Sequence, residues 1–350
     1  MRVLRQRKPA KGGLIADSRS ALPMKTRLFV DREIWPIAGT FTISRGSRTE
    51  AEVIVCRLER GIGIGRGECV PYRHYGETVE SVLQQIETAR AAIEAGISRT
   101  GLLAVMAPGA ARNAVDCALW DLEAKLSGRP VHLAVCETAP KPVVTAVTIS
   151  LGTPQQMANA AKLQNRQPVI KVKLGGEGDG ERIRAVRAAA PDSRIILDAN
   201  EAWSEAMLPK LMAISQQCSI ALIEQPLPAG NDAILATIPR AVPVCADESA
   251  HCSADLPALV GRYDCINIKL DKAGGLTEAL AMRDAAHALG FAVMIGCMVG
   301  TSLGMAPAVL LAQNTAFADL DGPLILANDR PHGLTYARGK VSPPTPALWG

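Results

Sequence analysis

Charged residues recur at the ends of successive apolar segments in the second half of this 350-residue chain. Each segment has the length and composition of a buried strand, and the charged positions follow one another at intervals of 22 to 26 residues. A strand, a helix and two short loops fit that interval. The five positions are Lys173, Asp198, Glu224, Asp247 and Lys269. Parallel strands with charges at one end predict a (β/α) barrel whose site lies at its C-terminal face.

The first third of the chain predicts a separate α+β domain. Residues 26–81 alternate or run apolar between turn signals, as antiparallel strands do. Residues 80–95 and 110–127 are predicted to be helices, and Gly128 caps the second one. The glycine-rich run 61–67 predicts a hairpin turn rather than a nucleotide-binding loop, because its glycines alternate and no helix follows.

The proline-containing segment 139–142 is the predicted boundary between the two domains. We therefore expect an α+β domain over residues 26–142 and a barrel over residues 143–322. The barrel strands are expected at residues 144–150, 169–174, 195–200, 220–224, 244–247, 266–270 and 291–296, with the segment 317–322 one repeat later.

The charge distribution separates the first residues from the rest of the chain. Residues 1–27 carry eight Lys and Arg against one acid, Asp17, which leaves 30 basic and 33 acidic residues elsewhere. We expect residues 1–25 to be a basic, disordered extension, with a transit-like segment as the alternative. The rest lacks the basic surface and the many aromatic residues that are typical of nucleic-acid-binding proteins, so no nucleic-acid partner is expected.

Two further features of the composition concern the cellular compartment. Residues 288–318 contain no charge and are long enough to span a bilayer, but they include glycines and a proline and stay in phase with the barrel repeat. We interpret them as a buried strand, 291–297, and a covered helix, 302–311. The nine cysteines include no C-x-x-C pair, and several lie in apolar segments, which is typical of a reducing compartment. We therefore expect a cytoplasmic protein without a membrane partner.

Asp198, Glu224 and Asp247 end three successive predicted strands. Neighbouring strands lie about 4.8 Å apart, so these carboxylates can converge on one ion. Without a cation they would repel one another and be protonated. Oxygen ligands on rigid strands suit Mg²⁺, and we expect one ion per subunit. Salt bridges to barrel lysines are the alternative, which explains a single acid better than three in register.

Three lysines flank these carboxylates. Lys171 and Lys173 face the same side of one strand, and neighbouring ammonium groups lower each other's pKa. Lys269 lies on the far side of the three acids. Two lysines on opposite faces of a carbon can remove its proton on one side and return it on the other. This favours racemisation or epimerisation next to a carboxylate, with the metal stabilising an ene-diolate. Surface lysines at strand ends are the alternative, which the apolar flanks disfavour.

Asp319 and Asp321 form another same-face pair, one repeat after Cys297. Two acids beyond the predicted metal set could hold a cationic group such as an amino terminus. A solvated acidic turn before Gly322 explains them equally well. The residues alone leave both interpretations open.

Short motifs run through both predicted domains. In the barrel they are Lys171-Val-Lys, Asp198-Ala-Asn, Glu224-Gln-Pro, Asp247-Glu-Ser and Asn267-Ile-Lys-Leu-Asp-Lys-Ala-Gly-Gly. Six further segments are Ser44-Arg-Gly-Ser-Arg48, Gly67-Glu-Cys-Val-Pro-Tyr72, Tyr75-Gly-Glu, residues 110–121, Gly296-Cys-Met298 and Asp319-Leu-Asp-Gly-Pro323. The barrel motifs resemble the enolase superfamily, muconate-lactonizing subgroup, and the further segments resemble the L-Ala-D/L-Glu (dipeptide) epimerases within it. The likeness covers about residues 26–325.

The resemblance implies a (β/α)₇β modified TIM barrel under an α+β capping domain, which the C-terminal segment 323–350 completes. It makes Asp198, Glu224 and Asp247 the Mg²⁺ ligands, and Lys173 and Lys269 the acid/base pair. The substrate-binding residues that it implies are Lys171 for the substrate carboxylate, Asp319 and Asp321 for the dipeptide ammonium, Arg48 for the glutamate side chain, and Thr148 and Cys297 for the cleft wall.

The leading hypothesis is Mg²⁺-dependent epimerisation of L-Ala-D/L-Glu dipeptides in the recycling of cell-wall peptides, and a homo-oligomer is left open. A second hypothesis is N-acylamino-acid racemisation, o-succinylbenzoate synthesis or muconate cycloisomerisation. These reactions use the same lysines and metal but bind no ammonium. A third is a catalytically silent barrel used for binding, which loss of a lysine or metal ligand would favour; none is lost.

Overall fold

The computed structural model describes residues 25–350. The first element of the fold along the chain is a three-stranded antiparallel sheet. Its strands are β1 (Arg27–Ile43), β2 (Gly46–Arg60) and β3 (Gly63–Cys69), in that order. The hairpin predicted in the run 61–67 is confirmed as the turn between β2 and β3, where Gly61 has a φ of +60°. The extension predicted for residues 1–25 lies outside the described residues except for Lys25.

The alternating glycines of β3 also let a helix pack closely on this strand. A Cβ atom on Gly65 would come within 2.2 Å of the Ala118 carbonyl oxygen, and one on Gly67 within 2.1 Å of that of Ala114. Both carbonyls belong to α3 (Ala110–Ser127), which therefore lies directly against the strand. The glycine pattern thus reflects helix packing as well as the turn.

Three more helices complete this capping domain: α1 (Val79–Glu94), α2 (Arg99–Val105) and α4 (His132–Val135). The predicted helix 110–127 is confirmed as α3, and its cap, Gly128, has a φ of +68°. Residues of the sheet and of α1, α2 and α3 form one buried cluster that includes Ile54, Ile86 and Val115. The cap therefore has a hydrophobic core of its own.

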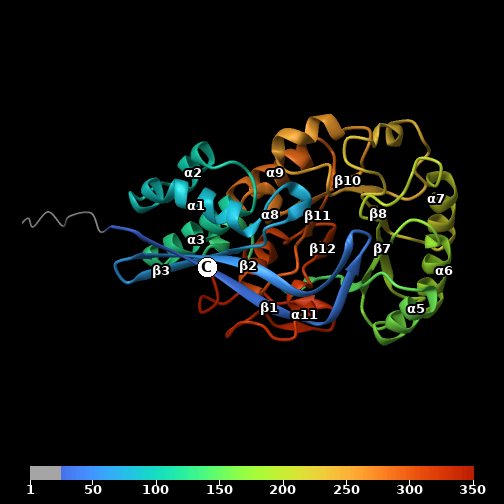
Figure 1. Cartoon of the computed structure of the whole chain (residues 1–350), viewed down its shortest axis with the longest axis horizontal. Helices are drawn as coiled ribbons and strands as arrows, with labels where there is room; N and C mark the ends of the chain where they lie inside the picture. The colour runs from blue at the N-terminus through green and yellow to red at the C-terminus, as the bar shows by residue number, and fades with distance from the viewer. Residues whose placement is uncertain (1–24) are drawn as a thin grey trace, which may run out of the picture.

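Eight parallel strands follow in consecutive order, which confirms the predicted barrel (Figure 1). They are β5 (Val147–Ile149), β6 (Val169–Lys173), β7 (Arg194–Asp198), β8 (Leu222–Glu224), β9 (Val244–Ala246), β10 (Cys265–Lys269), β11 (Ala292–Gly296) and β12 (Phe317–Asp319). The first and last strands meet at a seam, where the backbone N–H of Ala146 donates to the Ala318 oxygen over 2.9 Å. The barrel is therefore nearly closed.

The connections between the strands differ from the prediction in two places. Five carry α-helices, namely α5 (Pro154–Leu163), α6 (Asp179–Ala189), α7 (Leu208–Gln217), α8 with α9 (Leu270–Ala273 and Leu276–Ala288) and α10 (Ser302–Leu311). The connections after β8 and β9 contain only the 3₁₀ helices η2 (Ala233–Ala236) and η3 (Ser253–Leu259). Pro226, Pro228, Pro239 and Pro243 punctuate the first of these connections, and Pro257 lies inside the second.

The uncharged run 288–318 folds as β11, α10 and the start of β12, as predicted. Among residues 25–350, no helix is long and apolar enough to cross a membrane. Most residues of β11 and almost all side chains of α10 are instead buried in the protein.

The C-terminal segment returns from the barrel to the cap (Figure 1). It contains α11 (Gly322–Ile325) and the short strands β13 (Tyr336–Ala337) and β14 (Lys340–Val341), and β14 pairs with β4 (Val143–Val144). Trp349 Nε1 donates to the Cys117 oxygen over 3.0 Å, and the N–H of Gly350 donates to Asp121 Oδ1 over 2.7 Å. These contacts support the proposal that residues 323–350 complete the cap; the domain limits remain predictions.

One buried carboxylate of the cap, that of Glu68, contacts both the barrel and the C-terminal segment. Glu68, on β3, accepts hydrogen bonds from the backbone N–H of Thr301 and from Arg330 Nη2, each over 2.8 Å. Thr301 lies after the barrel strand β11, and Arg330 belongs to the C-terminal segment. Because the Glu68 side chain is fully buried, loss of Arg330 would leave its charge unpaired away from water.

Candidate active site

All but one of the predicted site residues lie at or just after the C-terminal ends of barrel strands. Thr148 belongs to β5, Lys171 and Lys173 to β6, Asp198 to β7, Glu224 to β8, Lys269 to β10 and Asp319 to β12, while Asp247, Cys297 and Asp321 follow β9, β11 and β12. The strand register sets Lys173 beside Asp198, and Asp198 beside Glu224. The exception is Arg48, which comes from β2 of the cap.

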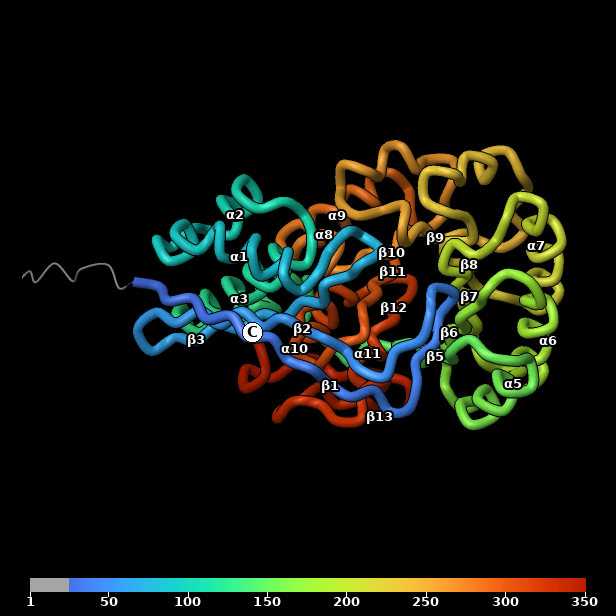
Figure 2. The backbone as a smooth tube through the Cα atoms, viewed as in Figure 1, coloured from blue at the N-terminus to red at the C-terminus, as the bar shows by residue number. Residues whose placement is uncertain are grey.

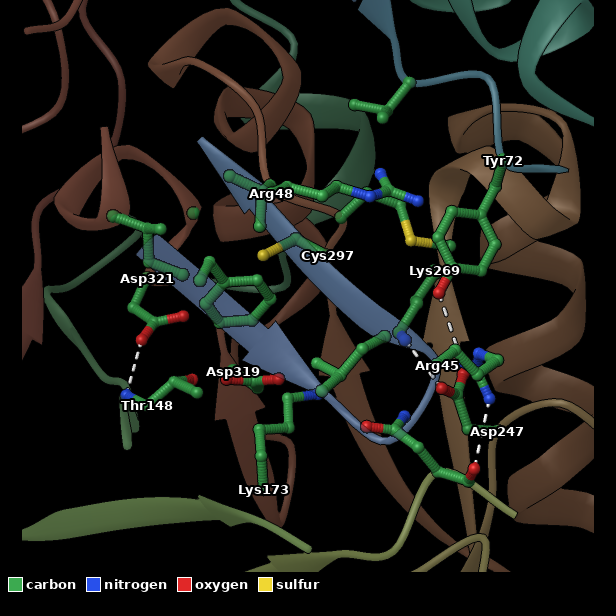
Figure 3. Close-up of a pocket in the computed structure, with 18 of the residues that line it drawn as sticks. Arg45, Arg48, Tyr72, Thr148, Lys173, Asp247, Lys269, Cys297, Asp319 and Asp321 are labelled. Carbon is green, nitrogen blue, oxygen red and sulfur yellow. Dashed lines mark hydrogen bonds and ion pairs between the residues drawn. The ribbon is translucent and has the colours of Figure 1, made fainter. Parts of the chain in front are cut away.

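One cavity between the cap and the barrel mouth collects most of these side chains (Figure 3). It encloses about 750 Å³ when the open mouth is included. The predicted residues that line it are Arg48, Thr148, Lys173, Asp247, Lys269, Cys297, Asp319 and Asp321. Lys171, Asp198 and Glu224 are not in its wall, because they are buried behind these residues.

Each of the three predicted metal ligands contacts a lysine in this structure. Lys173 Nζ lies 2.6 Å from Asp198 Oδ2, and Lys269 Nζ lies 2.6 Å from Asp247 Oδ2. Lys171 Nζ lies 2.9 Å from Asp198 Oδ2 and 2.7 Å from Glu224 Oε2. The ammonium group of Lys171 therefore bridges Asp198 and Glu224, which lie side by side on adjacent strands.

The three carboxylates do not converge on a common point here: within residues 25–350, no group of three acidic, histidine or cysteine side chains is arranged to hold a metal ion. The site nevertheless has more acceptors than donors. Five buried side-chain oxygens at the barrel mouth lack a hydrogen-bond donor, namely Asn200 Oδ1, Glu224 Oε2, Glu248 Oε2, Asn267 Oδ1 and Asp319 Oδ1. Glu224 Oε2 forms an ion pair with Lys171 Nζ, but the two groups are not oriented for a hydrogen bond. Buried unpartnered oxygens fit hard cations such as Mg²⁺.

The electrostatics of the site follow from burial and from the lysines. Burial and the nearby Asp198 raise the pKa of Glu224 to about 8. This is the expected direction for clustered carboxylates with too little positive charge around them. Burial by itself would lower the pKa of Lys171, but Asp198, Asp319 and Glu224 outweigh it and raise the pKa well above its ordinary value. The prediction that neighbouring ammonium groups depress this pKa is therefore wrong for Lys171, because carboxylates and not another cation dominate its surroundings.

Asp319 and Asp321 lie inside the site rather than on a solvated turn. They are 5% and 4% exposed, and both line the cavity. Lys171 Nζ donates to Asp319 Oδ2 and the backbone N–H of Thr148 donates to Asp321 Oδ2, over 2.7 and 2.6 Å. Asp319 Oδ1 is left without a donor, and burial together with Asp319 raises the pKa of Asp321 to about 7. A cationic ligand group would complete this pair.

The cap contributes two arginines to the cavity, and they differ in what they contact. Arg45 bonds Glu201 and Glu248 and the hydroxyl of Tyr72. Arg48 forms no ion pair within residues 25–350, and its guanidinium lies 5.3 Å from the centre of the Tyr72 ring. Arg48 is therefore the arginine that is available to an anionic ligand group.

Residue-level reasoning missed two side chains that hold Asp247 in place. Lys272 Nζ donates to Asp247 Oδ1 over 2.6 Å and also to its backbone oxygen. Gln225 Oε1 accepts from the backbone N–H groups of Asp247 and Ser249, over 2.8 and 3.1 Å. Both residues are buried. The available signal was their place inside the quoted motifs, directly after Glu224 and three residues after Lys269.

Comparisons with known families cover both domains. Residues 25–133 match the family model described as mandelate racemase / muconate lactonizing enzyme, N-terminal domain. Residues 155–346 match the model described as enolase C-terminal domain-like. The two matches correspond to the cap and to the barrel with the C-terminal segment.

Two curated relatives match over most of their length. The chain is 45% identical over 314 residues to an L-Ala-D/L-Glu epimerase from Escherichia coli (strain K12), covering 89% of this chain and 98% of that protein. It is 44% identical over 288 residues to an N-acetyl-D-glutamate racemase from a Pseudoalteromonas species, covering 82% and 91%. The relatives thus act on substrates with and without a free ammonium group.

Solved structures show the same fold. An enolase family member from Agrobacterium tumefaciens with homology to dipeptide epimerases, containing sodium, L-Ala-L-Glu and an ordered loop, has a TM-score of 0.92 and 54% identity, covering 93% of this chain and all of that one. A dipeptide epimerase from Methylococcus capsulatus, complexed with Mg and L-Arg-D-Lys, has a TM-score of 0.84 and 29% identity, covering 93% and 99%. Metal ions and dipeptides thus occur together in proteins of this fold.

Proposed function

This chain belongs to the mandelate racemase / muconate lactonizing enzyme group of the enolase superfamily, and from that premise we propose that it epimerises L-Ala-D/L-Glu dipeptides with the help of Mg²⁺. The epimerised centre is the α-carbon of the glutamate, next to the free carboxylate of the dipeptide. Identity to an epimerase and to a racemase over most of the chain makes this protein an isomerase.

The arrangement of charge in one cavity carries the proposal. Two buried aspartates, Asp319 and Asp321, line the cavity together with Arg48, and the lysines Lys173 and Lys269 reach the same space (Figure 3). A dipeptide that ends in glutamate has matching charges: an ammonium group for the aspartates and a side-chain carboxylate for the arginine. Lysines in the same cavity can reach its α-carbon.

The mechanism moves two different protons: one lysine removes the α-proton, and the other donates its own proton to the same carbon. In one direction, neutral Lys173 takes the α-proton and its electron pair stays on the substrate, which becomes an ene-diolate. Lys269, in its ammonium form, then donates a proton to the opposite face of the same carbon. The product has the inverted configuration, the two lysines have exchanged charge states, and the reverse reaction uses the same groups in reverse order.

The proposed metal ligands are Asp198, Glu224 and Asp247, with one Mg²⁺ per subunit. When bound, the ion would supply positive charge beside the substrate carboxylate, where negative charge develops as the proton leaves. Gln225 and Lys272 hold Asp247 in place from the other side. The Mg-containing dipeptide epimerase of similar fold supports this assignment.

Deuterium exchange tests the proposal directly. Purified protein is incubated with L-Ala-L-Glu and Mg²⁺ in D₂O, and mass spectrometry and chiral separation follow the product. We expect deuterium at the glutamate α-carbon and growth of L-Ala-D-Glu towards a mixture of both epimers. The absence of both deuterium and the D-epimer would refute the proposed reaction.

N-acetylglutamate racemisation is a second candidate, which the 44% identity to an N-acetyl-D-glutamate racemase favours. It uses the same lysines and metal ligands, but an N-acetyl group offers no cation to Asp319 and Asp321. Without a substrate cation, Asp319 would keep only the ammonium of Lys171, which it shares with Asp198 and Glu224, and Asp321 would face a neutral amide, which disfavours this substrate. Parallel assays of N-acetyl-L-Glu and L-Ala-L-Glu separate the two candidates.

The cellular role remains part of the proposal. An enzyme that interconverts L-Ala-D-Glu and L-Ala-L-Glu would act in the recycling of cell-wall peptides. None of the nine cysteines forms a disulfide, and most are buried, which supports the proposed cytoplasmic location. A homo-oligomer and the absence of nucleic-acid partners stay as predictions.

A further inference from the structure

The tip of the β1–β2 hairpin reaches from the cap to the barrel mouth (Figure 2). Its turn residues are Ser44 and Arg45, and Ser44 Oγ donates to the backbone oxygen of Asn200 over 3.0 Å. Arg45 Nη1 donates to the same oxygen and to Glu201 Oε2, each over 3.2 Å. Arg45 Nη2 donates to Glu248 Oε1 over 2.8 Å. One guanidinium of the cap therefore binds two separate loops of the barrel.

The two loops that Arg45 joins are those that follow β7 and β9. Asn200 lies two residues after Asp198, and Glu248 directly follows Asp247. The Glu248 side chain is 1% exposed, and the other donor to it among the described residues is Asn200 Nδ2, at 3.4 Å. A buried carboxylate with so few donors holds its arginine strongly, because losing that partner would leave a charge desolvated and unpaired.

The same turn sets the position of Arg48. Arg48 follows Arg45 by three residues, on the strand that starts at Gly46, and lines the cavity without an ion pair among residues 25–350. Arg45 keeps only 25% of its side-chain accessibility, and its guanidinium donates to Asn200, Tyr72 and Glu248. The two neighbouring arginines are thus in different states, one engaged with the protein and one available.

We propose that Arg45 is a latch: a positioning residue that holds the β1–β2 hairpin closed over the cavity and so presents Arg48 to the substrate. This inference rests on the proposed function, since Arg48 needs a ligand with a carboxylate to meet. Arg45 then supports the binding of every dipeptide that the closed cavity holds, whereas Arg48 selects for an acidic second residue. The competing assignment, in which Arg45 itself binds the substrate carboxylate, requires it to leave Glu248 unpaired.

Hydrogen exchange with mass spectrometry tests the latch without any turnover. Amide exchange is measured in peptides covering residues 41–48 for the wild type, Arg45→Ala, Arg45→Lys and Arg32→Ala. Arg32 is a matched control, because it lies on the same hairpin and bonds Glu52 of that hairpin. We expect about tenfold faster exchange in Arg45→Ala, a smaller increase in Arg45→Lys, and no change in Arg32→Ala. Unchanged exchange in Arg45→Ala overturns the proposal.

Steady-state kinetics supply the second readout, with L-Ala-L-Glu and the neutral analogue L-Ala-L-Gln as substrates. Arg45→Ala should raise KM about tenfold for both dipeptides and leave the preference for glutamate unchanged. A loss confined to L-Ala-L-Glu overturns the latch and assigns Arg45 to substrate recognition. If the wild type turns over neither dipeptide, the proposed function fails, while faster exchange in Arg45→Ala still establishes the latch.

Discussion

The backbone N–H of Thr148 donates to Asp321 Oδ2 over 2.6 Å, which joins the first barrel strand to the segment after the last one. The contact orients the Asp321 carboxylate across the seam of the barrel, beside Asp319 in the cavity wall. Since both acids are buried and Asp319 Oδ1 has no donor, the pair has a surplus of negative charge. A substrate ammonium group would balance that charge.

Removal of this charge should weaken the use of the free dipeptide. Losing one partner of a desolvated charged pair costs about 2–5 kcal/mol, so Asp321→Asn should lower kcat/KM for L-Ala-L-Glu by roughly thirtyfold or more. The assay compares free and N-acetylated L-Ala-L-Glu with both proteins. Equal use of the two compounds by the wild type would refute the ammonium site and favour an N-acylamino-acid racemase.

The same carboxyl should make stability depend on pH. The pKa of Asp321 is raised to about 7 in the folded protein, against an ordinary value near 3.9. Its contribution to stability is therefore full below about pH 4 and is lost as the pH rises through 7. Without metal and substrate, the decrease in unfolding free energy from pH 5 to 8 should be smaller in Asp321→Asn, by on the order of a few kcal/mol. Denaturant titration measures it, and equal decreases would contradict it.

Metal removal should abolish activity, and Mg²⁺ should restore it. Asp247→Asn should lose Mg²⁺ binding by calorimetry and lose turnover, because Asp247 is a proposed ligand. Asp264→Asn is a suitable control, since Asp264 bonds Arg240 and precedes β10, at the opposite end of the barrel from the cavity. Full activity in excess chelator would refute the metal assignment.

Loss of either lysine should stop epimerisation while one exchange reaction survives. Lys173→Ala and Lys269→Ala each retain a base on one face of the α-carbon. Each variant should exchange the α-proton of only one epimer with D₂O, and the two variants should act on opposite epimers. Nuclear magnetic resonance of each pure epimer detects this. Normal epimerisation by either variant would show that one base serves both faces.

Arg48→Ala should change specificity rather than chemistry. Its guanidinium has no ion pair within residues 25–350, so its removal leaves no charge of the protein unpaired. We expect the preference for L-Ala-L-Glu over L-Ala-L-Gln to fall about tenfold, with kcat for the neutral dipeptide retained. An unchanged preference would assign the glutamate carboxylate to another group.

Much of the site could be predicted because its residues recur at fixed places on a repeating unit. Lys173, Asp198 and Glu224 each end a short apolar strand, and the parallel register sets them side by side. Lys272 and Gln225 carried no such periodic signal. Their importance comes from hydrogen bonds to Asp247, which lies more than twenty residues away in each case.

The sequence by itself determined the eight-stranded barrel, the cap and the strand-end positions of the polar residues, because hydrophobic period, turn residues and spacing are local properties. Tertiary structure alone decided the direction of the pKa shift of Lys171 and the separate surroundings of Arg45 and Arg48. The sequence predicted a lowered pKa for Lys171, but carboxylates from three other strands raise it. Likewise, Arg45 is engaged by loops more than 150 residues away. Such long-range contacts set the local charge and solvation of a side chain, and no short segment contains them.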